Sequence, residues 1–260
     1  MYLSLLVKNF KQQFAYRSDV FFRIIGSILR IYIQICIWTA LLGHGGFTKT
    51  VSLPAMISYA IVSYFISELI HSRISYTIAN KVRLGAIAID LIRPVSLVRY
   101  LFCEQLSENV FYLIFAGGPV LLVAICFWGF TLPALPVLAH FLISLALAVI
   151  LMFYIEMAAG LLVFWVKDGA YADMLVGGLF TVFSGSTIPL WFYPKFLVTV
   201  ANALPFRYIT FEPISVFLGK YDLDQARQVI LIQMFWIGVV WLLERTIWQR
   251  VQKSIFVQGG

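Results

Sequence analysis

Charged residues are scarce in this sequence. They make up 12% of its 260 residues, whereas 62% are hydrophobic. Ordinary water-soluble domains carry about 25% charged residues. Most of the chain must therefore be solvated by lipid. The net charge of +7 collects in segments between apolar runs, which favours a membrane surface and argues against a nucleic-acid partner.

Groups that commonly carry catalysis are also missing. No GxxxxGK[ST] phosphate loop, HExxH pair or GxSxG elbow occurs. The three histidines are too dispersed for a metal site, and the three cysteines show neither metal spacing nor a disulfide framework. We therefore predict no catalytic residue, no metal site and no cofactor bound by this chain itself.

Apolar runs dominate what is present. A helix needs about 20 apolar residues to cross a bilayer, and six runs approach or exceed that length, the fifth being short. We expect a single all-α integral membrane domain with six transmembrane helices. The expected spans are residues 20–42, 53–79, 106–128, 137–166, 172–188 and 229–247.

Basic residues set the orientation. Most lysines and arginines fall in segments on the same side as the N-terminus when the spans alternate. Cytoplasmic loops carry such an excess. We therefore expect both termini in the cytoplasm. Six spans agree with this, because an even number places both termini on the same side.

Residues 1–19 alternate apolar and polar side chains. Leu6, Phe10 and Phe14 oppose Lys8 and Lys11. This pattern predicts an amphipathic helix in the headgroup plane, with membrane lipid as its partner.

A second unusual segment covers residues 189–220, between the fifth and sixth spans. It is aromatic and apolar but broken by Pro189, Pro194, Pro205 and Pro213. Non-helical backbone at membrane depth is tolerated only against protein or a cavity. We expect extracellular re-entrant helices that form an outer gate, with Phe192 and Phe206 beside the first three prolines.

Residues 80–100 form the polar stretch between the second and third spans. Leu84 and Ile87 recur at helical spacing, Asp90 lies toward the other side, and Pro94 ends the pattern. We expect a basic amphipathic helix on the cytoplasmic side. From the residues alone, it is either a docking surface for a soluble protein or a loop lying on lipid.

Ionisable residues also occur inside the spans. Arg23 and Arg30 share one face of the first span, and Glu68 lies on a polar face of the second. We predict an ion pair between Arg30 and Glu68, because they lie at similar depth and an unpaired charge there is costly. The alternative is a polar seam beside a transport path; Glu156 in the fourth span has the same two interpretations.

Several motifs together resemble the permease subunits of type-2 ABC exporters, in the branch that has paired permeases. The resemblance covers nearly the whole chain. It rests on Gly85 with Leu91-Ile92-Arg93-Pro94, on Ser184-Gly185, Ile188-Pro189-Leu190 and Phe192-Tyr193-Pro194, and on Leu204-Pro205-Phe206.

The resemblance implies an exporter of a hydrophobic or amphipathic substrate in a bacterial inner membrane. It implies two copies of a cytoplasmic ABC ATPase, which bind the ATP and Mg²⁺, and a second permease subunit that is a different paralogue. The residues implied to couple the chain to the ATPase are Arg83, Gly85, Asp90, Arg93 and Pro94.

Two other classes of function compete with this one. An integral-membrane enzyme acting on lipid would use Glu68, His71 and Glu156 as acid–base groups. A proton-coupled secondary transporter would use Glu68 or Glu156 as its proton site. A requirement for ATP or for a proton gradient would separate these hypotheses.

Overall fold

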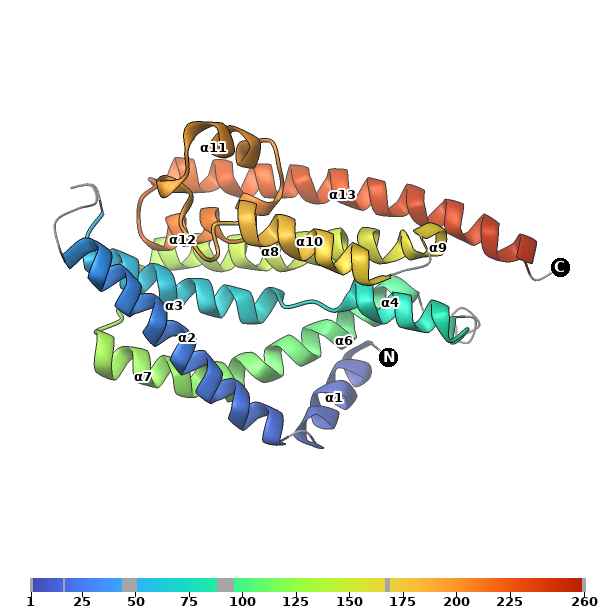
Figure 1. The fold of residues 1–260 in the computed structure, drawn as a ribbon, viewed down its shortest axis with the longest axis horizontal. Coiled ribbons are helices and arrows are strands. Elements are labelled where there is room, and N and C mark those ends of the chain that lie inside the picture. The colour runs from blue at the N-terminus through green and yellow to red at the C-terminus, as the bar shows by residue number, and fades with distance from the viewer. Residues whose placement is uncertain (1, 16, 44–50, 88–95, 167–168, 259–260) are drawn as a thin grey trace.

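The computed structural model describes residues 2–15, 17–43, 51–87, 96–166 and 169–258. Every regular element in these ranges is helical, as predicted (Figure 1). Short 3₁₀ turns cover Gln13–Ala15, Leu190–Phe192 and Phe206–Tyr208, and a π-helical turn covers Leu113–Gly117. The α-helices are α1 (Tyr2–Gln12), α2 (Arg17–Gly43), α3 (Leu53–Ile70), α4 (Ile74–Arg83), α6 (Leu97–Tyr112), α7 (Gly118–Trp128), α8 (Leu135–Leu161), α9 (Val163–Val166), α10 (Gly169–Phe183), α11 (Lys195–Asn202), α12 (Phe211–Phe217) and α13 (Leu223–Gln258).

Five helical segments are long and apolar enough to cross a membrane, and they correspond to five of the six expected spans. The apolar part of α10 is shorter. It covers Tyr171–Phe183, or about 20 Å at 1.5 Å per residue, against about 30 Å of hydrocarbon. The count of six therefore stays a prediction. The five long segments are Ser18–Leu42, Leu53–Arg83, Leu97–Trp128, Leu135–Trp165 and Leu223–Gln252.

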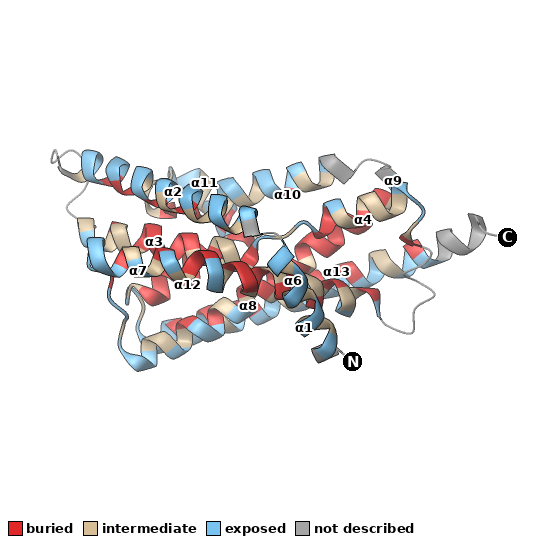
Figure 2. Cartoon of the chain, turned by 90° about the horizontal axis from the view of Figure 1, so that it is seen from below, coloured by how far each residue is buried: buried red, intermediate tan, exposed pale blue. Residues whose placement is uncertain are grey.

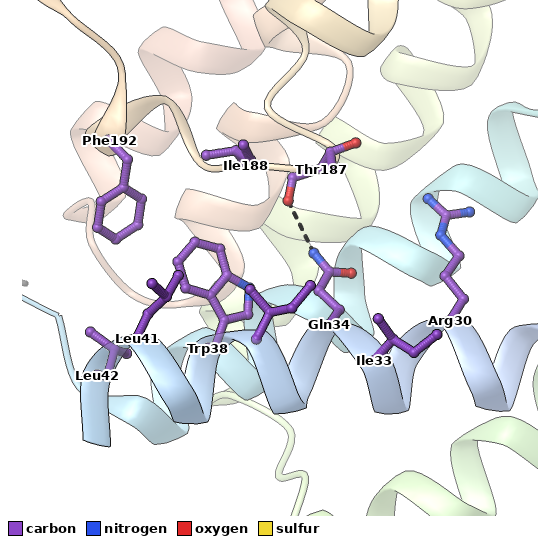
Figure 3. Close-up of a pocket in the computed structure, with 10 residues that line it drawn as sticks. Arg30, Ile33, Gln34, Trp38, Leu41, Leu42, Thr187, Ile188 and Phe192 are labelled. Atoms are coloured by element: carbon purple, nitrogen blue, oxygen red, sulfur yellow. Dashed lines mark hydrogen bonds between the residues drawn. The ribbon is translucent and has the colours of Figure 1, made fainter. Parts of the chain in front are cut away.

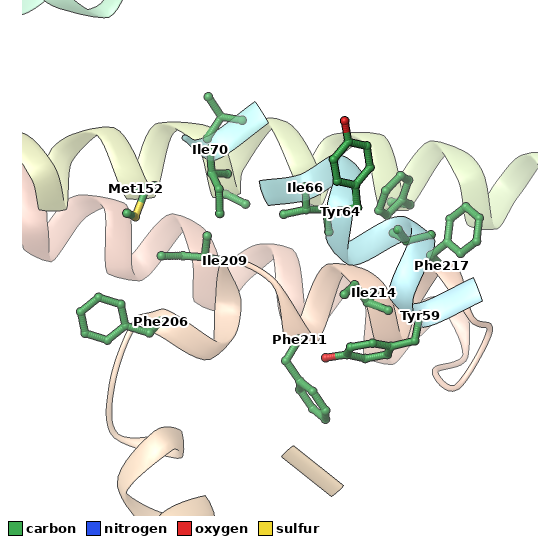
Figure 4. Close-up of a cluster of buried hydrophobic side chains, with 14 of the residues drawn as sticks. Tyr59, Tyr64, Ile66, Ile70, Met152, Phe206, Ile209, Phe211, Ile214 and Phe217 are labelled. Carbon is green, nitrogen blue, oxygen red and sulfur yellow. The ribbon is translucent and has the colours of Figure 1, made fainter. Parts of the chain in front are cut away.

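The core forms where α3, α8, α12 and α13 meet. α8 packs along α13 and also contacts α3, α4 and α12. Tyr59, Ile66 and Phe211 are buried in this cluster (Figure 4). In contrast, Phe22 of α2 and Met174 of α10 are exposed, as are many of their neighbours (Figure 2). Apolar outer faces of this kind suit contact with lipid or with another membrane protein.

The second expected span is interrupted. α3 ends at Ile70 and α4 begins at Ile74, and the backbone between them is not helical. This corrects the expected continuous helix over residues 53–79; no proline or glycine marks the break. The third segment also differs, because α6 begins at Leu97 and reaches α7 through the π-helical turn. Pro119 lies in the first turn of α7 and has no N–H to donate, which explains the irregular backbone just before it.

The N-terminal helix forms as predicted and packs against α6. The rings of Phe10 and Phe14 lie 5.4 Å and 5.1 Å from that of Phe111. Lys8 and Lys11 are exposed. The apolar side of this helix therefore meets protein as well, while its position at the lipid surface stays a prediction.

Residues 189–220 fold into short helices, with α12 buried along its length. The preceding turn is fixed to α3: the Tyr59 hydroxyl donates to the Gly185 carbonyl and the Ser63 hydroxyl to the Ser186 carbonyl, both at 2.6 Å. Gly185 has φ of +74°, which a residue with a Cβ adopts only at a cost. The broken, compact segment agrees with the proline pattern; re-entry into the bilayer stays a prediction.

Candidate functional site

The turn that follows α4 lies at the end of the bundle opposite α11 (Figure 1). Arg83 is exposed and donates to the Asn80 side chain at 2.9 Å. Gly85 has φ of +69° and donates its N–H to the Val82 carbonyl at 3.1 Å, so it terminates α4, which ends at Arg83. This corrects the continuous amphipathic helix expected over residues 80–100, because Leu84 lies in the turn and not in a helix with Ile87. Ile87 is buried in a cluster with Leu97. Three other predicted coupling residues, Asp90, Arg93 and Pro94, lie outside the described residues, as does the middle of the predicted helix, residues 88–95.

An ion pair joins α2 to α3, but its members differ from the prediction. Arg23 Nη1 lies 3.0 Å from Glu68 Oε2, and the Arg23 guanidinium stacks 3.7 Å from the centre of the Tyr112 ring. The expected pair of Arg30 with Glu68 is therefore corrected to Arg23 with Glu68. The prediction assumed that Glu68 lies well inside a continuous second span, at the depth of Arg30. In the structure, α3 ends two residues after Glu68, at Ile70.

Two polar residues of α6 donate hydrogen bonds to backbone carbonyls at the break between α3 and α4. Asn109 donates to the Leu69 carbonyl at 2.6 Å, and Gln105 donates to the His71 carbonyl at 3.3 Å. Ser72 donates in turn to the side-chain oxygen Oε1 of Gln105 at 3.1 Å. Sequence reasoning missed these residues, although an amide pair at i, i+4 in an apolar span was a usable signal for a broken partner helix.

A second polar cluster joins α4, α8 and α10. The Ser75 hydroxyl bonds the Glu156 carboxylate and lies 3.1 Å from Asp173 Oδ1. The single hydroxyl of Ser75 is therefore shared by two carboxyl groups. The helices approach closely here: a Cβ at Gly160 would lie 2.9 Å from Ser75 Cα. This cluster ties the helix before the turn to the centre of the bundle.

The predicted outer-gate residues take two kinds of position. Pro189, Pro194 and Pro205 each occupy the N-cap of the short helix that follows, where a missing N–H is tolerated. Phe206 is buried in the core, whereas Phe192 stacks on Trp38. Their role as a gate stays a prediction.

A buried ion pair stabilises the same outer segment. Arg207 pairs with Glu212, and both side chains are largely inaccessible. Burial raises the pKa of Tyr221, and the charge of the Glu212 carboxylate raises it further. The phenol therefore stays protonated at neutral pH.

A groove of about 430 Å³ runs between α2 and residues 187–192 (Figure 3). Gln34 bridges its two walls by donating to the Thr187 carbonyl at 3.1 Å. Trp38 stacks on Phe192 with ring centroids 5.2 Å apart. Most other lining side chains are aliphatic, and Arg30 is the charged residue among the described residues that line the groove.

Two of the three acid–base groups of the enzyme hypothesis, Glu68 and Glu156, pair with side chains of other helices. Glu68 pairs with Arg23, and Glu156 bonds Ser75. Among the described residues, no group of three or more His, Cys, Asp or Glu side chains is placed to hold a metal ion. These two carboxylates thus connect helices to one another.

These features define a class: a multi-pass α-helical membrane protein. The chain belongs to the ABC-2 transporter family, since the family model described as "ABC-2 family transporter protein" matches residues 28–259. The resemblance drawn from the motifs is thereby confirmed. The family is a membrane component of transport systems, and an ABC permease works with an ATPase. No curated protein matches the chain.

Proposed function

We propose that the chain is the permease subunit of an ATP-driven exporter that moves a hydrophobic or amphipathic molecule out of a bacterial cell. In this proposal, two cytoplasmic ATPase subunits bind ATP and Mg²⁺, and a paralogous permease completes the membrane part. Membership of the ABC-2 family carries the proposal.

The ATPase would dock on residues 80–100, at the cytoplasmic end of the bundle. The contacts on both sides of the turn support this role. Ile87 and Leu97 are buried in one cluster, and α4 is held to α8 by the Gly160 contact and the Ser75–Glu156 bond. A displacement of the turn would therefore move α4 and α8 together, because packed helices transmit strain.

Co-expression with the ATPase tests the docking site. We expect Arg83→Glu and Gly85→Val each to reduce, by at least about five-fold, the ATPase recovered with the permease, an energetic change of about 1 kcal/mol. Gly129→Val is the matched control. Gly129 also has positive φ (+62° against +69°) and no neighbour within 4 Å of an added Cβ, but it lies after α7.

The outcomes separate two questions. If both variants recover as much ATPase as the wild type does, the turn is not part of the docking surface. Absence of any co-purifying ATPase, together with transport that ignores ATP, would reject the exporter itself.

One observation favours a second candidate, the proton-coupled transporter. Two carboxyl groups, of Glu156 and Asp173, share the Ser75 hydroxyl inside the bundle. Proton relays in membranes use such groups. Transport driven by a proton gradient without ATP, and abolished by Glu156→Gln, would support this candidate over the exporter.

A further inference from the structure

The groove beside α2 contains one charged side chain, Arg30, which lies in the middle of a spanning helix. Arg30 is twelve residues from each end of the Ser18–Leu42 segment, or about 18 Å at 1.5 Å per residue. Among the described residues, no acidic side chain forms an ion pair with it, whereas Arg23 on the same helix pairs with Glu68. A guanidinium at this depth is unfavourable unless it meets water or an anion.

The remainder of the groove is shaped for an apolar body. From Arg30 to Leu42, its α2 wall is about 18 Å long. Ile33, Ile37 and Leu41 line that wall, and the stacked pair of Trp38 and Phe192 lies toward its far end (Figure 3).

The wall of the groove also contains a buried donor. Trp38 is 5% exposed, and its indole N–H has no acceptor among the described residues. That nitrogen is itself buried, so a molecule in the groove would contact the indole ring and not the N–H.

From this arrangement we infer that the groove binds a single-tailed anionic amphiphile, with its carboxylate or phosphate head at Arg30 and its tail along α2. Charge complementarity selects the head, because a bidentate guanidinium–oxyanion contact restores the counter-ion that the protein does not supply. The aliphatic wall and the aromatic pair receive the tail. The inference deepens the proposed export function, and rests on it, by naming the class of substrate.

Quenching of tryptophan fluorescence tests the inference on the purified full-length chain in phosphatidylcholine nanodiscs at pH 8. The probes are a fatty acid with a brominated tail and the amine and alcohol that carry the same tail. The Trp38 signal is the difference between the wild type and Trp38→Phe. We expect the fatty acid to quench Trp38 with an apparent Kd at least ten-fold lower than that of the amine.

Variants of Arg30 test whether its positive charge causes the preference for the fatty acid. Arg30→Gln should remove the preference for the fatty acid, and Arg30→Lys should retain most of it. Arg245→Gln is the control, since Arg245 lies on the spanning part of α13 and does not line the groove. Replacing part of the phosphatidylcholine by phosphatidylglycerol distinguishes the source of the anion: competition identifies a bilayer phospholipid, and no competition a free amphiphile.

Equal quenching by the three probes, or unchanged selectivity in Arg30→Gln, would overturn the inference. So would an intermolecular disulfide formed by Arg30→Cys with a cysteine on a second permease, because another subunit would then cover the groove. The binding assay needs no ATPase. If the wild type shows no preference for the fatty acid but still couples to an ATPase, only the proposed ligand is rejected. If it binds the fatty acid selectively but has no ATPase partner, only the proposed exporter is rejected.

Discussion

Replacing Glu68 by glutamine removes the counter-ion of Arg23 at the junction of α2 and α3. The two charged groups lie 3.0 Å apart, and their side chains are 26% and 12% exposed for arginine and glutamate. In Glu68→Gln, the guanidinium keeps its place over the Tyr112 ring but loses the carboxylate. The folded state should therefore become less stable.

The burial of the pair sets the size of this effect. Breaking a fully buried pair costs about 3 to 5 kcal/mol, whereas an exposed pair contributes about 0.2 to 1 kcal/mol. Since a quarter of the Arg23 side chain is exposed, we expect a loss of about 2 kcal/mol in the free energy of unfolding. For a chain of this length, that corresponds to a Tm lower by about 4 to 8 °C.

A double-mutant cycle on thermal stability in detergent isolates the pair. Arg23→Gln and Glu68→Gln should be coupled by about 1 to 2 kcal/mol. The comparison cycle joins Arg30→Gln with Glu68→Gln. Arg30 lies two turns, or about 10 Å, farther along α2 than Arg23, so these changes should be nearly additive. Additivity in the Arg23 cycle, or stronger coupling in the Arg30 cycle, would refute the pairing.

Two close approaches of the backbone give further predictions, both measured as changes in Tm. Gly160→Val should lower stability by about 1 to 3 kcal/mol, because its Cβ would lie 2.9 Å from Ser75 Cα and push α4 from α8. Gly178→Val, with no atom within 4 Å of the added Cβ, should change it by no more than about 0.5 kcal/mol; equal losses would contradict the contact. Gly185→Ala should cost about 2 kcal/mol, and Gly219→Ala about 1 kcal/mol. Both have positive φ, but only at Gly185 would the Cβ meet Phe211 and Tyr59, each at 3.1 Å; a larger loss at Gly219 would reverse the argument.

The sequence was sufficient to predict the long helices, because a run of about 20 apolar residues has few alternatives to a spanning helix. It also predicted the amphipathic α1 and the broken backbone over residues 189–220, where proline removes donors. It failed at His71–Arg73, where no proline or glycine interrupts the pattern. That break changed the depth assigned to Glu68 and hence its partner, since depth was counted along a continuous helix.

The polar residues inside the spans show why candidate sites were difficult to recognise from sequence. A glutamine or tyrosine in an apolar run suggests a transport path, yet several of these side chains donate to backbone carbonyls at irregular positions. Tyr59 donates to the Gly185 carbonyl, Asn109 to that of Leu69, and Gln233 to that of Tyr208. Without water in the hydrocarbon region, each carbonyl freed by an interruption needs such a donor. A polar side chain in this bundle is therefore evidence of a site only when its donors have no acceptor within the protein. Arg30 in the α2 groove meets that criterion, since its guanidinium has no acceptor among the described residues.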